Sequence, residues 1–389
     1  MSLTKDALCP KCGFTQLVSV EYDESIQENV THNSIENSRV YNMWRYSEFL
    51  PIDLPDVVSL NEGFTPLVRL EELSKNSGVN FLAKNDTVNP TGSFKDRGSS
   101  TLISWLRKNK VKRIAVPSSG NFASSMAAYA ARAGIKGYVL VPSDAGLGKI
   151  VQSLFHGSTV ITSSSDLQKI IEEHGEEIGI HLCSHSPISW EGPKTIGYEV
   201  SEQLKWNPPD WFVFPSGTCT GITGCWKGFK DFHRLDLIPR IPRIICISPQ
   251  GAPIVDAFKR KSKEIKSGRS QKTIAGPIGG GGSGPRGQLA LDAIYETKGL
   301  AEEVSDEEII EAAKYLAKTE GLFVEPSSAA SVAGSIKLVD QGLIDKGDVV
   351  VCILTGSGFK TLDKYEEYVE KPVQIEASKE ALKLLFVTH

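Results

Sequence analysis

From about residue 81 onward, short β-branched runs alternate with helical segments that open on Gly or Ser. The β-branched runs predict strands at 113–117, 137–142, 211–214, 243–248 and 348–354. The segments between them predict helices at 121–133, 147–155, 306–319 and 326–338 and one that begins at 221. Strands that alternate with helices form βα units, so the pattern predicts an α/β fold on mostly parallel sheets.

The two ends of the chain have a different character. The first 60 residues contain a polar run through Asn37 and few periodic apolar positions, which predicts an extension that packs against another part of the protein. Residues 365–389 predict a strand and a terminal helix, and we place a C-terminal helix or tail at 376–389. A chain of 389 residues is long enough for two or three domains.

Composition narrows the class of partner. Lys and Arg total 43 against 47 Asp and Glu, so the chain lacks the basic footprint of a nucleic-acid-binding protein and favours a small-molecule partner. No run approaches the roughly 20 apolar residues that a membrane helix needs, which predicts a protein that does not span a membrane. Seven irregularly spaced cysteines and no secretory leader predict a reduced, cytoplasmic setting.

Three loops carry candidate chemistry, at 89–98, 118–124 and 216–223. A Gly- and Thr-rich turn before a helix offers backbone N–H groups to a phosphate, although the same pattern also suits plain helix capping. Walker and GxGxxG spacings are both missing, so a nucleoside phosphate is not indicated. Lys95 could act as a Schiff-base nucleophile if its pKa were lowered, or could be a surface lysine paired with Asp96.

Taken together and in this order, the loops resemble those of the fold type II (tryptophan synthase beta-like) pyridoxal phosphate-dependent enzymes. The segment Asn-Pro-Thr-Gly-Ser-Phe-Lys-Asp-Arg-Gly at 89–98 matches the threonine synthase branch almost letter for letter. The agreement extends from about residue 44 to about residue 360, and further matching segments lie at 61–67, 127–134, 191–195, 325–330 and 354–358.

The resemblance implies a fold and a set of domains. We expect a fold type II enzyme with two open, twisted, mostly parallel-sheet domains, the cofactor in the cleft between them, and an N-terminal extension. The expected boundaries are 1–60 for the extension, 61–95 with 196–375 for the large cofactor-binding domain, and 96–195 for the small domain. The family also suggests a homodimer.

The resemblance also implies roles for residues. Lys95 would carry pyridoxal phosphate as a Schiff base and shuttle protons during the reaction. Asn121 would contact the phenolic oxygen of the cofactor, and Thr355 would face the ring nitrogen and leave it largely unprotonated. The cofactor phosphate would lie on Gly217, Thr218, Cys219, Thr220 and Gly221. The substrate would lie on Ser118, Ser119, Gly120 and Asn121, with Ser184, Lys194 and Arg286 as further candidates.

Several positions depart from the threonine synthase pattern. Phe122 stands where a threonine is usual, Cys183 and Ser189 where an asparagine and an arginine are usual, and Ser357 where a histidine is usual. The cofactor loop has Thr218 where an asparagine is expected. Loss of a phosphate-binding arginine means that the anion site is rebuilt or that the substrate has changed. Cations that could rebuild the site are Arg286, Lys194, Lys149 and Arg97.

The expected activity is therefore that of a threonine synthase-like lyase of amino-acid biosynthesis, which converts O-phospho-L-homoserine and water into L-threonine and phosphate. The alternative is a related replacement or elimination enzyme, either cysteate synthase-like on O-phosphoserine or threonine/serine dehydratase-like. A cofactor-free binding protein would lack the lysine or the phosphate loop, and both are present.

Cys9 and Cys12 form half of a zinc ribbon, whereas a structural zinc site needs four ligands. No second CxxC follows, although His32 or the pair of another chain could complete the site. We therefore predict no metal.

Overall fold

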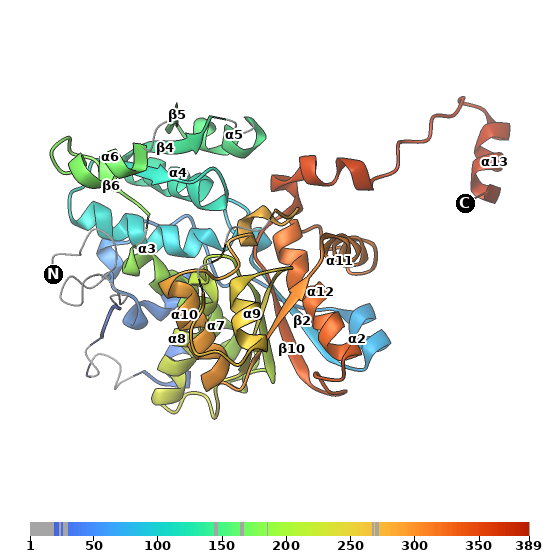
Figure 1. The fold of residues 1–389 in the computed structure, drawn as a ribbon, viewed down its shortest axis with the longest axis horizontal. Helices are drawn as coiled ribbons and strands as arrows, with labels where there is room; N and C mark the ends of the chain where they lie inside the picture. The colour runs from blue at the N-terminus through green and yellow to red at the C-terminus, as the bar shows by residue number, and fades with distance from the viewer. Residues whose placement is uncertain are drawn as a thin grey trace.

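The computed structural model describes residues 19–22, 25, 30–143, 147–163, 167–184, 186–266, 268 and 272–388. Its strands form two sheets, and helices pack around both (Figure 1). Within these residues no helix is long and apolar enough to cross a membrane. The predicted α/β fold with mostly parallel sheets is confirmed.

The larger sheet has six strands in the order β1-β2-β10-β7-β8-β9. Only β1 runs antiparallel to its neighbour, and the other pairs are parallel. The strands span Leu67–Arg69 (β1), Asn80–Asn85 (β2), Trp211–Pro215 (β7), Arg243–Pro249 (β8), Leu300–Val304 (β9) and Val349–Leu354 (β10). All six come from the segments 61–95 and 196–375.

The smaller sheet has four parallel strands in the order β5-β4-β3-β6. They span Arg113–Pro117 (β3), Lys136–Pro142 (β4), Thr159–Ser163 (β5) and His181–Leu182 (β6). All four come from residues 96–195. The chain therefore builds the large sheet from two segments and the small sheet from the stretch between them, at the top left of the molecule (Figure 1).

Thirteen helices of α type accompany the sheets in the described chain. Those before β4 are His32–Glu36 (α1), Glu71–Ser77 (α2), Lys95–Lys108 (α3) and Asn121–Ala133 (α4). The middle ones are Leu147–Phe155 (α5), Leu167–His174 (α6), Pro187–Gln203 (α7), Thr220–Arg234 (α8) and Pro253–Lys259 (α9). The last are Pro285–Glu296 (α10), Asp306–Thr319 (α11), Pro326–Asp340 (α12) and Lys379–Thr388 (α13).

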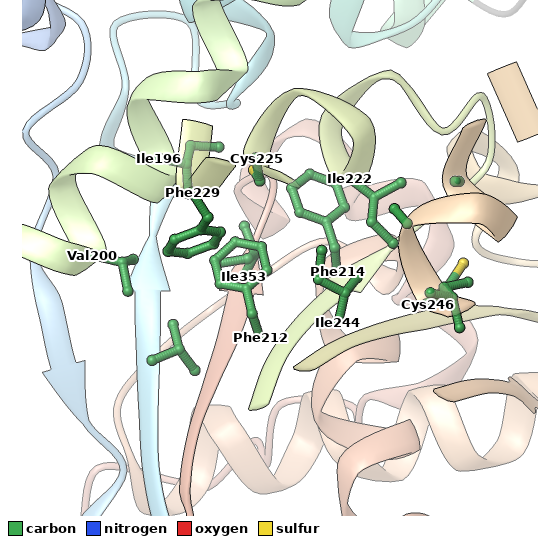
Figure 2. Close-up of a cluster of buried hydrophobic side chains, with 14 of the residues drawn as sticks. Ile196, Val200, Phe212, Phe214, Ile222, Cys225, Phe229, Ile244, Cys246 and Ile353 are labelled. Atoms are coloured by element: carbon green, nitrogen blue, oxygen red, sulfur yellow. The ribbon is translucent and has the colours of Figure 1, made fainter. Parts of the chain in front are cut away.

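Apolar side chains cover both faces of the six-stranded sheet. Along β7, Phe212 and Phe214 belong to one buried cluster, whereas Trp211 and Val213 belong to the other, because successive side chains of a strand point to opposite faces. Helices α7, α8 and α10 close the first face, and Figure 2 shows the rings of β7 packed on α7 and α8 there. Helices α2, α11 and α12 close the second face.

The described part of the N-terminal extension is fixed to the body of the protein. The 3-10 helix Met43–Phe49 lies on α7, where Arg45 pairs with Glu202. The indole nitrogen of Trp44 donates to Glu62 at 2.9 Å and to Ser100 on α3 at 3.0 Å. This segment therefore helps to hold α3 and α7, two helices that pack against each other.

The predicted strand after residue 365 is wrong. Residues 366–368 form a 3-10 turn, and the chain from 370 to 376 has no regular secondary structure. Among the described residues this segment joins neither sheet, and Val369 and Val373 are 67% and 64% exposed. Helix α13 follows and stands away from both sheets (Figure 1).

Candidate active site

One cavity lies where strands of both sheets end, with a volume of about 1290 Å³. The segments that follow β3, β7 and β10 line it, as expected for ligand sites at the carboxyl ends of parallel strands. All but one of the predicted site residues line this cavity: Lys95, Ser118, Ser119, Gly120, Asn121, Ser184, Gly217, Thr218, Cys219, Thr220, Gly221, Arg286 and Thr355.

The loop before Lys95 is clamped to the end of β10. The backbone amide of Phe94 donates to the carbonyl of Thr355 at 2.9 Å, and the amide of Ser357 donates to the carbonyl of Gly92 at 2.9 Å. Gly92 has a φ of +79°, a conformation that favours glycine. The turn ends at Phe94, and Lys95 is the first residue of α3 rather than part of the turn that the sequence suggested.

Asp96 fixes the same loop from within the protein. Its buried carboxylate accepts hydrogen bonds from the amide of Thr91 at 2.7 Å and from the hydroxyls of Thr91 and Ser125, each at 2.6 Å. Burial raises the pKa of Asp96 to about 6, although these hydrogen bonds oppose the rise. The carboxylate of Asp96 therefore binds the loop and α4 through these hydrogen bonds, and it makes no ion pair with Lys95.

The amine of Lys95 lies in an environment that favours its neutral form. Its Nζ lies 4.5 Å from the centre of the Phe94 ring. Burial and then the positive charge of Arg286 lower the pKa of Lys95 to about 8, against the opposing charge of Glu325. A lysine with such a pKa is a better nucleophile and base near neutral pH than a solvated one.

Asn121 begins α4 and faces the carboxylate of Glu325, the N-cap residue of α12. Its Nδ2 donates to Oε2 of Glu325 at 2.9 Å. Space beside the preceding Gly120 is open, since a Cβ there would meet no atom within 4 Å. The first turn of a helix leaves backbone N–H groups without intrahelical partners, so the start of α4 can bind an anion in the cavity.

The loop before α8 provides a second helix N-terminus. Cys219 has a φ of +62° and turns the chain into α8. A Cβ at Gly217 would lie 2.6 Å from backbone atoms of residues 277 and 278, and one at Gly221 would lie 2.2 Å from the Phe214 ring. Glycine at both positions therefore lets the loop pack tightly while Thr218 and Thr220 stay accessible.

Arg286 adds positive charge beside this loop. It lies in the first turn of α10, and its Nη1 lies 3.4 Å from the hydroxyl of Thr220. No carboxylate within the described ranges pairs with it, and burial lowers its pKa. A half-buried guanidinium that lines a cavity without a counter-charge is suited to bind an anionic ligand.

Lys194, the one predicted residue that does not line the cavity, is fully buried elsewhere. Its Nζ pairs with Glu191 at 2.8 Å and with Asp231 at 3.1 Å. This position argues against the predicted role in binding substrate, because both carboxylates already balance its charge. Arg97 is engaged in the same way, with Asp86 and Glu199.

Of the remaining candidates, one lines the cavity and the others lie outside the described residues or have undescribed side chains. The Ser184 hydroxyl lines the cavity and is buried without a hydrogen-bond partner. Cys9 and Cys12 lie outside the described residues, as does the side chain of Lys149. No cluster of three or more His, Cys, Asp or Glu suited to a metal ion occurs in the described ranges.

Four charged residues that line the cavity escaped the sequence-based prediction, namely Glu325, Lys360, Asp363 and Lys364. Glu325 belongs to the matching segment 325–330, which was the available signal, whereas Lys360 has none. Lys360 Nζ donates to the carbonyl of Thr91 at 2.8 Å, to Oε1 of Gln152 at 2.6 Å and to the hydroxyl of Ser124 at 3.2 Å. It therefore links the end of β10 to α4 and α5 of the small sheet.

Comparisons with known proteins agree with this geometry. A family model described as "Pyridoxal-phosphate dependent enzyme" matches residues 58–356. A threonine synthase of Methanocaldococcus jannaschii is 40% identical, with 96% of this chain and 98% of the relative covered. A threonine synthase of Methanosarcina acetivorans is 37% identical, with 96% and 93% covered.

Solved structures with lower sequence identity share the fold. Threonine deaminase isoform 2 of Solanum lycopersicum, in its processed form, superposes with a TM-score of 0.68 at 22% identity, and 95% of this chain and 98% of that chain are covered. Maize serine racemase gives a TM-score of 0.64 at 22% identity, with 78% and 93% covered. At this identity the likeness concerns the fold alone.

Proposed function

Because the chain belongs to the family of pyridoxal-phosphate dependent enzymes, we propose that it is a threonine synthase-like lyase that converts O-phospho-L-homoserine and water into L-threonine and phosphate. One observation carries this proposal. A single cavity brings together a lysine amine of lowered pKa, the N-termini of α4 and α8, and an arginine that has no carboxylate partner within the described ranges.

The residues of the cavity fit pyridoxal phosphate. The N-terminus of α8, with Thr218 and Thr220, is suited to its phosphate, and the Lys95 amine is the group that would hold it covalently. The hydroxyls of Ser184 and Ser327 line the cavity, buried and unpartnered, as expected of a site built for a polar ligand. When bound, the cofactor supplies an electron sink for negative charge that develops at the amino-acid substrate.

The protein groups position the substrate and move its protons. Residues 118–121 present the start of α4 to the substrate α-carboxylate. Lys95, whose pKa is about 8, takes a proton from the substrate Cα and returns protons to the substrate side chain. Thr355 would offer a neutral hydroxyl to the ring nitrogen of the cofactor, and Asn121 would contact its phenolic oxygen.

Arg286 is the residue that we propose to meet the substrate phosphate. It lines the cavity and lacks a carboxylate partner in the described part of the chain, so an incoming phosphate would gain a charge-assisted hydrogen bond. Phe122 and Ser189 also line the cavity. These two uncharged side chains favour a second candidate, a related enzyme that acts on the shorter O-phosphoserine or on unphosphorylated serine or threonine.

We also propose the larger organisation of the enzyme. Residues 96–195 would form the small domain over the large domain of 61–95 and 196–375, with the cofactor between them and the homodimer as the working unit. A cytoplasmic setting is supported by the cysteines at 183, 219, 225, 246 and 352, which are free and buried.

The proposed activity is tested by product analysis. Purified protein loaded with pyridoxal phosphate is given O-phospho-L-homoserine or O-phospho-L-serine, and released phosphate and amino acids are measured, with Lys95→Ala as blank. Threonine and phosphate in equal amounts from phosphohomoserine are the expected result. Turnover of phosphoserine alone, or deamination of serine or threonine alone, would support the second candidate, and no turnover of any of them would refute both.

A further inference from the structure

Glu325 lies at the junction of the two sheets and contacts residues from each. It is the N-cap residue of α12, and its side chain lines the cavity although the residue is only 2% exposed. One carboxylate oxygen, Oε2, accepts from Nδ2 of Asn121 at 2.9 Å. The other, Oε1, accepts from the hydroxyl of Thr355 at 3.3 Å.

Contacts with Gly356 and Ser328 hold the Glu325 segment in place. The amide of Glu325 donates to the carbonyl of Gly356 at 3.0 Å. The hydroxyl of Ser328 lies 3.1 Å from that of Thr355, and it accepts from the amide of Gly356 at 2.8 Å. A Cβ at Gly356 would lie 2.5 Å from Cδ of Glu325, so only glycine leaves room for the carboxylate.

We propose that Glu325 is a positioning residue that joins Asn121 and Thr355 into one hydrogen-bonded frame around the cofactor ring. The inference rests on the proposed function, which places Asn121 beside the phenolic oxygen and Thr355 beside the ring nitrogen. Nδ2 of Asn121 has two hydrogens, so Glu325 can fix one and thereby aim the other at the ring. Asn121 begins the helix after β3 of the small sheet, and Thr355 comes directly after β10 of the large sheet. The same carboxylate therefore also sets the distance across the cavity.

The charges around Glu325 agree with this role. Burial raises its pKa, while the Asn121 hydrogen bond and the charges of Lys360 and Lys95 oppose the rise. The phenol of Tyr365 also lies near Glu325, but its hydroxyl donates to the carbonyl of Val324 at 2.6 Å. In the described structure, no lysine that lines the cavity forms an ion pair with Glu325, so the hydrogen bonds to Asn121 and Thr355 define its position.

The test is the visible spectrum and the cofactor affinity of Glu325→Gln, with Glu302→Gln as a matched control. Glu302 is likewise buried, but it lies on β9 beside Lys259 and Lys337 and does not line the cavity. For Glu325→Gln we expect a shifted absorption band of bound pyridoxal phosphate and a roughly fivefold higher dissociation constant for the cofactor, the size of one lost net hydrogen bond. Glu302→Gln should match the wild type in both.

A second variant displaces the carboxylate without removing it. In Gly356→Ala the new Cβ would press on Glu325, and we expect a spectral shift as in Glu325→Gln. A folded Glu325→Gln with the wild-type band and affinity would overturn the inference, and Gly356→Ala decides by the same criteria if Glu325→Gln does not fold. If Lys95→Ala loses the cofactor absorption band while Glu325→Gln and Gly356→Ala keep the wild-type band, the role of Glu325 is refuted but the proposed function is not. A wild type that gives no cofactor band defeats the proposed function as well.

Discussion

Replacement of Arg286 by alanine should separate the binding of the substrate phosphate from that of the rest of the substrate. The guanidinium lines the cavity, lies 3.4 Å from the Thr220 hydroxyl, and has no carboxylate partner in the described part of the chain. A hydrogen bond to a charged group contributes about 1.5–3 kcal/mol, which corresponds to a roughly 10- to 150-fold weaker affinity when it is lost. The replacement removes no ion pair between described residues, so folding should be unaffected.

The assay compares two ligands of the holoenzyme. One is a phosphonate analogue of O-phospho-L-homoserine, whose carbon–phosphorus bond is not cleaved, and the other is the same amino acid without the phosphonate group. Binding is followed by the change in visible absorbance, and Arg260→Ala, which removes an exposed guanidinium paired with Asp256, is the control. We expect weaker binding of the phosphonate only.

Two results would refute the reasoning about Arg286. Equal weakening of both ligands would mean that Arg286 does not contact the substrate phosphate. An unchanged preference for the phosphonate, together with weaker binding of pyridoxal phosphate, would place Arg286 at the cofactor phosphate instead.

Three further predictions concern Lys95 and the buried ion pairs of Arg97. Lys95→Ala should fold with a thermal melting curve close to that of the wild type, because the amine makes no ion pair in the described structure, yet it should show no absorption band of covalently bound cofactor. Since the pKa of Lys95 is about 8, the rate of covalent cofactor attachment to the apoprotein should rise about tenfold per pH unit below pH 8 and level off above it; a rate that keeps rising to pH 10 would contradict the lowered pKa. Arg97→Ala would leave Asp86 buried without its cationic partner and Glu199 paired with Lys84 alone, and it should lower the free energy of unfolding by about 3–5 kcal/mol in urea titrations.

Helices with local end signals could be predicted from the sequence nearly to the residue. The predicted helix 306–319 is α11, where Ser305 and Glu308 form a capping box. The predicted helix 121–133 is α4, which ends at Ala133 and is followed by the C-cap residue Gly134 with a φ of +69°. In these cases a few neighbouring residues decide where the helix begins and ends.

Helix α7 had no such signal and was not predicted. It contains Pro193 in its interior and is buried over most of its length, so it shows no amphipathic pattern to distinguish it from a loop. Its position depends on tertiary contacts, among them Gly192 against the backbone of residues 97 and 98, and Gly224 and Gly228 of α8 against α7. Such close approaches are a property of the fold and cannot be deduced from local sequence.

The residues of the candidate site also fall into those that local sequence predicted and those that only the fold brings into place. Loops that follow strands bring Lys95, Asn121 and residues 217–221 into one cavity, as the order of motifs predicted. Lys194 was predicted as a cation available to the substrate because of its charge. Glu191 lies on the same helix three residues earlier, but the second partner, Asp231, lies on α8, which only the fold brings beside α7. Lys360 belongs to the cavity for the converse reason, because the loop 89–94 and α4 meet it there.

The most direct test of the central claim is to identify the lysine that holds the cofactor. The holoenzyme is reduced with sodium borohydride, digested and mapped by mass spectrometry. The account predicts one modified peptide, which carries the cofactor on Lys95. Modification of Lys360 or Lys364, the other lysines that line the cavity in the described structure, or no modified peptide at all, would contradict the assignment of this cavity and its chemistry.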